Sequence, residues 1–331
     1  MKHFYPIFPV LLVLTVLLGC ASESPVPETT ALPAQQETIA DAQTEPICAT
    51  MPPPVISQQP PAPAVSIVLQ PEASGENVEE NEFAQVDYSH TEDGYLMVRY
   101  TAETDKRLKV LINGPSATYT YNLPAQQWTV FPLSDGNGTY QIGIYENIVD
   151  SRYAKVLAFS CEVSLLDEFA PFLRPNQYVN FSADSQAVAL GAELTREQTD
   201  PLKKVETVYD YVVAALRYDD EKAAAVQSGY LPDLDQILQD GKGICFDYAA
   251  VMTAMLRSQE IPCKLVVGYA GTVYHAWISV WTEESGWVDG AIFFDGHQWQ
   301  RLDPTYASTA LKDASVLDFI RSGTYTAKYL Y

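Results

Sequence analysis

Gly241-Lys-Gly-Ile-Cys-Phe-Asp-Tyr-Ala-Ala250 joins a glycine turn to a helix-forming pattern, with a cysteine at the junction. Glycine permits a tight turn, and the small and apolar residues that follow have helical spacing. We therefore predict a helix that begins at Cys245 and ends near Ser258. The unpaired N–H groups and the positive partial charge of a helix N-terminus favour a thiolate, and Lys242 adds a nearby cation.

An imidazole and a carboxylate follow the cysteine along the chain. His275 opens the alternating run His-Ala-Trp-Ile-Ser-Val-Trp, which predicts a strand, and Asp303 ends the next short strand. A thiol, an imidazole and a carboxylate can act as nucleophile, general base and orienting group in attack on an acyl carbon. We interpret Cys245, His275 and Asp303 as a candidate catalytic triad, with the N–H of Cys245 as one oxyanion donor.

Each member of this set has an ordinary structural alternative. A cysteine at a helix start is commonly structural, a histidine that opens a strand is commonly half-buried, and an aspartate before proline is a common turn former. His297, in a turn-like stretch, is a weaker candidate for the base, and Asp247 is expected to favour the helix N-terminus electrostatically. The ordered combination of the three in fitting contexts favours the triad.

The segment from about 195 to 310 resembles the transglutaminase-like superfamily, a branch of the papain-like cysteine enzymes. The resemblance implies that Cys245, His275 and Asp303 form a Cys-His-Asp triad, and that the cysteine opens a helix packed on an antiparallel sheet. Residues 283–294 are an insertion relative to the shorter family pattern, so the shape of the substrate cleft stays open. The matching pieces are Gly243-Ile-Cys245, Asp247-Tyr-Ala249, Met255-Leu-Arg257, Ile261-Pro262, Val267-Gly-Tyr269, His275-Ala-Trp277, Trp299 and Asp303-Pro-Thr305.

Helices precede strands in this part of the chain, which is typical of an α+β domain. Asp200-Pro201 predicts a helix start, and apolar residues recur at intervals of three and four as far as Leu216. A shorter helix is predicted from Asp233 to Leu238, before Gly241. The predicted strands are Lys264–Tyr269, His275–Trp281, Trp287–Val288 and Gln300–Leu302.

Residues 82–166 are predicted to form an all-β, immunoglobulin-like or fibronectin-like sandwich, because short alternating runs and turn residues follow one another closely. Tyr119 and Tyr121 would share one strand face and, with Trp128, are a candidate binding surface; ordinary strand composition is the alternative. Residues 167–194 are predicted to be an irregular connector before the transglutaminase-like domain at 195–331. The predicted strands are Gln85–Ser89, Tyr95–Thr101, Leu108–Ile112, Ala117–Asn122, Trp128–Leu133, Tyr140–Tyr145 and Lys155–Leu165.

The N-terminal part predicts export and a tether. Residues 1–20 combine Lys2, a short apolar run and Leu17-Leu-Gly-Cys20, which resembles a bacterial lipobox with Cys20 as the lipidated residue. An ordinary secretory signal is the alternative. Residues 21–81 hold eleven of the 22 prolines and no Lys or Arg, and they are predicted to be a disordered linker. The short run 64–69 is a candidate first strand of the next domain.

Charge and cysteine usage restrict the partners. A formal net charge of −22 argues against nucleic acid, which needs clustered cations, and against peripheral binding to anionic lipid. Five cysteines are too few and too scattered for a disulfide framework. Cys161 and Cys263 are expected to be small buried apolar residues. The sequence has no Cys-x-x-Cys or His-x-x-x-His pair, so neither a metal nor a cofactor is expected.

Together these features predict an exported lipoprotein, anchored to the cell membrane, that attacks amide bonds of envelope proteins or peptides, including cell-wall peptides, through a thioester. Water as the second nucleophile gives hydrolysis and an amine gives transamidation; both use the same acyl-enzyme. The alternative is a non-catalytic envelope-binding module that retains the scaffold of the transglutaminase-like domain.

Overall fold

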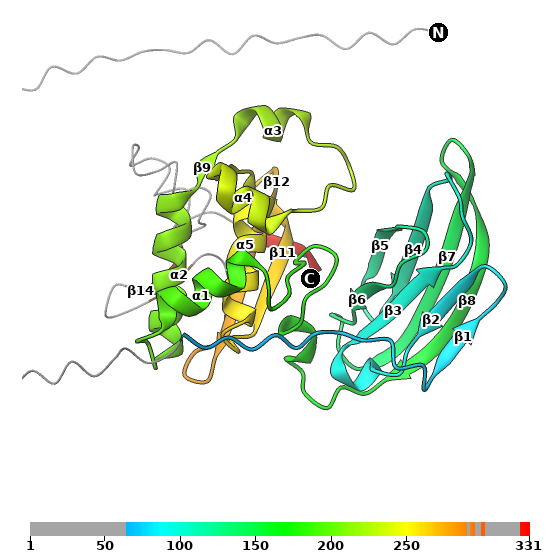
Figure 1. The fold of residues 1–331 in the computed structure, drawn as a ribbon, viewed down its shortest axis with the longest axis horizontal. Coiled ribbons are helices and arrows are strands. Elements are labelled where there is room, and N and C mark those ends of the chain that lie inside the picture. Colours follow the sequence, from blue (N-terminus) through cyan, green and yellow to red (C-terminus); the bar gives the residue numbers. More distant parts are fainter. Residues whose placement is uncertain (1–63, 290–291, 295–298, 302–324) are drawn as a thin grey trace, which may run out of the picture. The chain divides into compact units, whose positions relative to one another are not determined.

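Strands come first along the folded chain, and a group of helices and further strands follows them (Figure 1). A computed structural model describes residues 64–289, 292–294, 299–301 and 325–331. Cys20, Cys48, His297 and Asp303 lie outside these described residues.

The first group consists of two four-stranded antiparallel sheets. One has the order β1-β2-β3-β6 and the other has the order β5-β4-β7-β8. The strands are β1 (Val78–Glu80), β2 (Ala84–Asp87), β3 (Tyr95–Tyr100), β4 (Leu108–Asn113), β5 (Thr118–Leu123), β6 (Thr129–Pro132), β7 (Gly138–Val149) and β8 (Arg152–Val163). A 3₁₀ turn, η1 (Thr91–Asp93), precedes β3.

Alternating side chains of these strands build the core. On β4 the side chains of Leu108, Val110 and Ile112 are buried and those between them are half-buried, which is the period of two expected for a strand. The rings of Tyr121 on β5 and Phe131 on β6 lie 4.8 Å apart, so both sheets contribute to one cluster. The seven strands predicted from alternation coincide with β2 to β8.

The structure favours ordinary strand composition over a binding surface for Tyr119 and Tyr121. These side chains are only 4% and 1% exposed, because their face of β5 packs inward. Tyr119 contacts the ring of Tyr329 at 5.7 Å, and Tyr121 contacts the ring of Tyr331 at 5.9 Å. Alternation identified the strand, but it did not show that another part of the chain covers its aromatic face.

The last part of the predicted linker, residues 64–81, is placed in the structure. β1 pairs with β2, and the N–H of Ile67 donates to the carbonyl of Ser258 at 2.9 Å. The amide of Gln259 donates to the carbonyl of Val65 at 3.0 Å. The run 64–69 is therefore not a strand of the first domain. It is an extended segment that hydrogen-bonds to the chain just beyond helix α5 (Cys245–Arg257).

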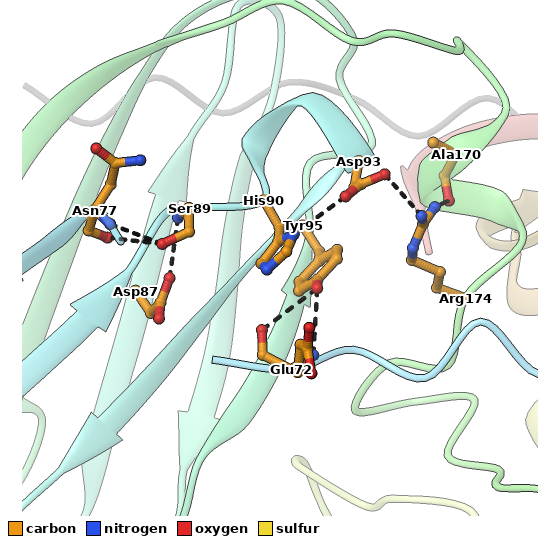
Figure 2. Close-up of polar contacts among 9 residues, drawn as sticks. All are labelled: Glu72, Asn77, Asp87, Ser89, His90, Asp93, Tyr95, Ala170 and Arg174. Carbon is orange, nitrogen blue, oxygen red and sulfur yellow. Dashed lines mark hydrogen bonds and ion pairs between the residues drawn. The ribbon is translucent and has the colours of Figure 1, made fainter. Parts of the chain in front are cut away.

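A polar network holds the segment that follows β8 (Figure 2). The guanidinium of Arg174 donates to Asp93 at 2.9 Å and to the carbonyl of Ala170 at 3.2 Å. Asp93 is also 3.1 Å from the ring of His90, which stacks on Tyr95 at 5.2 Å. These contacts attach the 3₁₀ turn η2 (Ala170–Phe172) and its neighbours to the turn before β3.

The prediction that residues 167–194 form an irregular connector is wrong at its C-terminal end, where helix α1 (Gln186–Thr195) begins. Gly191, in the middle of α1, lowers the helix propensity of this segment, so the sequence pattern did not predict a helix. A Cβ atom at Gly191 would lie 3.2 Å from the backbone and the side chain of Met255 in α5. The glycine thus permits close packing of α1 on α5, and tertiary contact outweighs propensity.

The other predicted helices are confirmed. They are α2 (Pro201–Ala215), α4 (Leu234–Asp240) and α5 (Cys245–Arg257), and an additional short helix is α3 (Asp220–Ala225). The Asp200 carboxylate caps α2 by accepting from the N–H of Leu202 at 2.9 Å. Gly241 ends α4 in the left-handed conformation, with φ of 61°.

Helix α5 packs against a four-stranded antiparallel sheet with the order β13-β12-β11-β16. Every side chain from Asp247 to Arg257 is buried, so α5 is the central helix of this group. The strands are β11 (Cys263–Ala270), β12 (Val273–Thr282), β13 (Gly286–Asp289) and β16 (Tyr325–Leu330). Two short pairs complete the described elements: β9 (Arg217–Tyr218) with β10 (Lys242–Gly243), and β14 (Ile292–Phe294) with β15 (Trp299–Arg301).

Within the described ranges, no helix has both the length and the apolar character needed to cross a membrane.

Candidate active site

Cys245 is the first residue of α5 and is half-buried. The turn before it is closed by Asp247, whose N–H donates to the carbonyl of Ile244 at 2.9 Å and whose carboxylate accepts from the N–H of Ile244 at 2.9 Å. A Cβ atom at Gly243 would lie 2.7 Å from the Cβ of Asp247, so only glycine fits there. The turn residues therefore present the cysteine at a free helix N-terminus.

The carboxylate of Asp247 is fully buried and has further partners. The ammonium of Lys222 lies 2.6 Å from it, and the hydroxyl of Tyr230 donates to it at 2.7 Å. An isolated buried carboxylate would be costly, and these partners compensate its desolvation. Asp247 thus does more than favour the helix N-terminus, because it links the segment 222–230 to the turn before the cysteine.

Lys242, expected to favour the thiolate, has a different partner. Its ammonium lies 2.9 Å from the carboxylate of Asp219, and this contact raises the pKa of Lys242. The pKa of Asp219 is lowered mainly by the hydrogen bond from the N–H of Lys222 and further by Lys242. Lys242 is therefore paired with Asp219, and the position of Cys245 at the start of α5 is the feature that the structure retains from the prediction.

His275 lies on β12 opposite Gly268 of β11 and is 5% exposed. Its ring stacks against that of Trp277 at 6.4 Å. The position opposite it is crowded, because a Cβ atom at Gly268 would lie 2.1 Å from the carbonyl oxygen of Thr326 on β16. Neighbouring strands thus define the surroundings of the imidazole.

One cavity of about 490 Å³ brings the two sites together. His275 lines it, and so do Ile244 and Phe246, the residues on either side of Cys245. The hydroxyl of Tyr274, next to His275, lies within electrostatic range of the Cys245 thiol. The cavity therefore lies between the imidazole and the turn that carries Cys245, although the Cys245 side chain is not among its described lining residues. The predicted third member, Asp303, is not described, and its relation to His275 stays a prediction.

The two other described cysteines have different surroundings. Burial raises the pKa of the Cys263 thiol to about 11, and Cys263 is fully buried beside Thr253. Burial also raises the pKa of the half-buried Cys161 thiol to about 11. These thiols are mostly protonated near neutral pH, so neither is suited to nucleophilic attack. All three cysteines are free.

Sequence reasoning missed most of the cavity wall. The missed residues come from four separate stretches, and their side chains carry no motif. They are Thr120, Tyr178, the loop 226–230, and Tyr329 with Tyr331. Among the described residues, no cluster of His, Cys, Asp and Glu could hold a metal ion.

Comparison with known proteins identifies a related family. The family model of the Transglutaminase-like superfamily matches residues 188–304, which include Cys245 and His275. Two curated relatives match part of the chain. YebA of Bacillus subtilis, described as an uncharacterized protein, is 27% identical over 170 residues, which is 45% of this chain and 22% of YebA. Protein-glutamine gamma-glutamyltransferase of Pseudomonas aeruginosa is 28% identical over 136 residues, which is 35% of this chain and 19% of that protein.

The chain spans about a fifth of the length of these curated relatives. Among solved structures, a protein named "Putative Cysteine Protease from Cytophaga hutchinsonii" is 15% identical and has a TM-score of 0.33, covering 77% of this chain and 81% of that one. A TM-score this low does not by itself establish a shared fold. The family match carries the assignment: residues 188–304 are a transglutaminase-like superfamily domain with mixed helices and strands.

Proposed function

We propose that the protein is a cysteine enzyme that attacks amide bonds of envelope proteins or peptides through a thioester. The observation that carries the proposal is the single cavity lined by His275 and by both neighbours of Cys245. Members of the transglutaminase-like family are cysteine peptidases or transglutaminases, which supports acyl chemistry at this cysteine.

In the first half of the reaction, the sulfur of Cys245 bonds to the amide carbonyl carbon, and its proton passes to His275. The C–N bond then breaks, and His275 returns that proton to the leaving amine. The N–H of Cys245, at the start of α5, would donate to the developing oxyanion. Asp303 would orient His275 by accepting from its second ring nitrogen.

In the second half, water or an amine attacks the thioester carbonyl. His275 takes the proton of the incoming nucleophile and passes it to the sulfur as the C–S bond breaks. Water gives a carboxylic acid and an amine gives a new amide, so hydrolysis and transamidation differ only in the second nucleophile.

Export and lipid anchoring at Cys20 form part of the same proposal. The motif Leu17-Leu-Gly-Cys20 after a short apolar run supports it. Mass spectrometry of the membrane fraction would test it: Cys20 should carry the lipid, and Cys20→Ser should release the protein from the membrane.

We further propose that β1 to β8 form an immunoglobulin-like sandwich. In that fold one sheet has neighbours A-B-E and the other has C-F-G, which the orders β2-β3-β6 and β4-β7-β8 reproduce. The hydroxyl of Tyr140, near the start of β7, donates to the carbonyl of Gly136 at 2.9 Å. This bond resembles the tyrosine corner of immunoglobulin-like domains.

A peptidyl acyloxymethyl ketone, which alkylates activated cysteines, tests the enzyme proposal. Cys245 should be labelled at least about a hundredfold faster than Cys263, and His275→Gln should reduce that rate by about a hundredfold. His90→Gln, which changes a histidine in the turn before β3, is the matched control and should leave the rate unchanged. Equal labelling of Cys245 and Cys263 would instead indicate a non-catalytic binding module.

A further inference from the structure

The described residues that line the cavity beside Cys245 carry no formal charge when His275 is neutral, although the chain carries a formal net charge of −22. Apart from His275, its lining contains no acidic or basic side chain. At the edge of the cavity Lys222 and Asp247 pair with each other at 2.6 Å, and the exposed ammonium of Lys328 lies 5.1 Å from the centre of the Tyr329 ring. A charged group that entered the cavity would lose water without gaining a partner of opposite charge among the described lining residues.

Aromatic rings form much of the wall. They come from Tyr178, Tyr230, Phe246, Tyr274, Tyr329 and Tyr331. The hydroxyl of Tyr230 donates to Asp247, and the hydroxyls of Tyr178 and Tyr331 hydrogen-bond to each other. With these polar ends engaged, the rings remain to contact a ligand, and aromatic rings favour apolar and aromatic groups.

The apolar surface continues outside the cavity. At the β11–β12 hairpin, Tyr269, Val273 and Tyr274 are 41%, 53% and 56% exposed. The rings of Tyr269 and Tyr274 pack against each other at 5.5 Å. Adjacent exposed apolar groups of this kind typically mark binding surfaces. Tyr274 belongs to both the hairpin and the cavity, so the two surfaces are continuous.

We propose that the cavity binds a neutral apolar or aromatic side chain of the peptide substrate, adjacent to the amide that Cys245 attacks, and discriminates against charged side chains at that position. This inference rests on the proposed function and names its substrate class. A volume of about 490 Å³ lies within the range of small-ligand sites, so one large side chain fits without opening of the wall.

The loop 226–230 is the part of the wall that sets this preference. Lys222 and Tyr230, which precede and end the loop, both contact the Asp247 carboxylate. The same carboxylate accepts from the N–H of Ile244, next to the nucleophile. A single buried group therefore holds the substrate wall and the cysteine turn in one arrangement. Asp247 is a positioning residue in this scheme.

Three acyloxymethyl ketone probes that differ only in the side chain beside the reactive carbonyl test the proposal. The side chains are those of Phe, Glu and Lys, and the rate of Cys245 labelling is followed by intact mass spectrometry. We expect the Phe probe to react at least about tenfold faster than either charged probe, because neither charge finds a partner in the cavity.

Substitutions in the wall should change this selectivity in a defined direction. Val226 lines the cavity and is 36% exposed, so a charged residue there is compatible with folding. Val226→Lys should raise the Glu:Lys probe ratio by about fivefold, and Val226→Glu should lower it equally. Ile148→Lys, at a 65% exposed position on β7, is the control and should retain the native ratio.

The outcomes separate the two proposals. Equal rates for all three probes at Cys245 would overturn the proposed selectivity and leave the enzyme proposal intact. A Phe preference unaffected by both Val226 variants would overturn the assignment to this cavity. If no probe labels Cys245 faster than Cys263, the proposed function itself fails.

Discussion

The two ends of α5 each carry a fully buried charged side chain, but the two have different partners. At the N-terminus Asp247 contacts a lysine, a tyrosine hydroxyl and one backbone N–H. At the C-terminus, about 15 Å away, Arg257 donates to the backbone carbonyls of Arg174, Cys263 and Tyr331. Each charge also has the sign that its end of the helix dipole favours.

The C-terminal end of α5 therefore contributes mainly to stability, whereas the N-terminal end also contacts the candidate active site. Arg257 joins three chain segments that are far apart in sequence, and all of its partners are main-chain groups. Asp247 joins the turn before Cys245 to a side wall of the cavity. We therefore expect substitutions at the C-terminal end to affect folding most, and substitutions at the N-terminal end to affect Cys245 as well.

The largest effect is expected for Arg257→Ala. The carbonyls of Arg174, Cys263 and Tyr331 would lose the guanidinium as a donor, and the free energy of unfolding should fall by about 3–5 kcal/mol. Chemical denaturation monitored by fluorescence measures the change. Arg217→Ala, an exposed arginine on β9, is the control and should change stability by less than about 0.5 kcal/mol. An unchanged denaturation midpoint for Arg257→Ala would remove the structural role assigned to the C-terminal end.

The thiols near the two ends should differ in reactivity by about two powers of ten. With a pKa of about 11, Cys263 at pH 8 is about one part in a thousand thiolate, since 10 raised to (8 − 11) is 0.001. Burial also shields it. Iodoacetamide at pH 8 should therefore alkylate Cys245 at least about a hundredfold faster than Cys263, equivalent to about 2.7 kcal/mol.

Peptide mapping after timed quenching measures both alkylation rates. Raising the pH toward 11 should increase labelling of Cys161 before that of Cys263, because Cys161 is half-buried and has a similarly raised pKa. In concentrated guanidinium chloride all three should react alike. Rapid alkylation of Cys263 in the native protein would contradict the burial assigned to it.

Asp247→Asn should have an intermediate effect. It removes the charge that Lys222 faces, but the ammonium is 28% exposed and water can partly solvate it, so the loss should be about 1–3 kcal/mol. Labelling of Cys245 by the Phe probe should also slow, because the turn and the wall share this carboxylate. Asp240→Asn, exposed at the end of α4, is the control. A loss of stability with no change in the preference for Phe would limit Asp247 to a structural role.

The smallest effect, about 1 kcal/mol, is expected for Asp200→Ala. This residue caps α2 with one hydrogen bond at 2.9 Å and is exposed, so it measures the contribution of an N-terminal carboxylate alone. Thermal unfolding of Asp200→Ala and Asp247→Asn compares the stability that each variant loses. If Asp200→Ala costs as much as Asp247→Asn, then Lys222 and Tyr230 add nothing to the N-terminal network.

Local signals predicted the elements that they encode. The N-cap at Asp200, the left-handed residue at Gly241 and the alternation in β4 each depend on a few neighbouring residues, and the structure confirms them. α1 escaped prediction because Gly191 weakens its pattern, while close packing on α5 requires that same glycine. The buried position of Tyr121 escaped for a related reason, since its partner Tyr331 is 210 residues away.

The candidate site divides in the same way. Cys245 and His275 were found in the sequence because a helix start and a strand start are local features, and chemistry restricts the residue types that can act there. Lys222, Tyr230 and Tyr331 could not be found, because the residues next to them in the sequence do not indicate which group or cavity they contact. Long-range packing determined the wall, the burial of Asp247 and the separate roles of the two ends of α5.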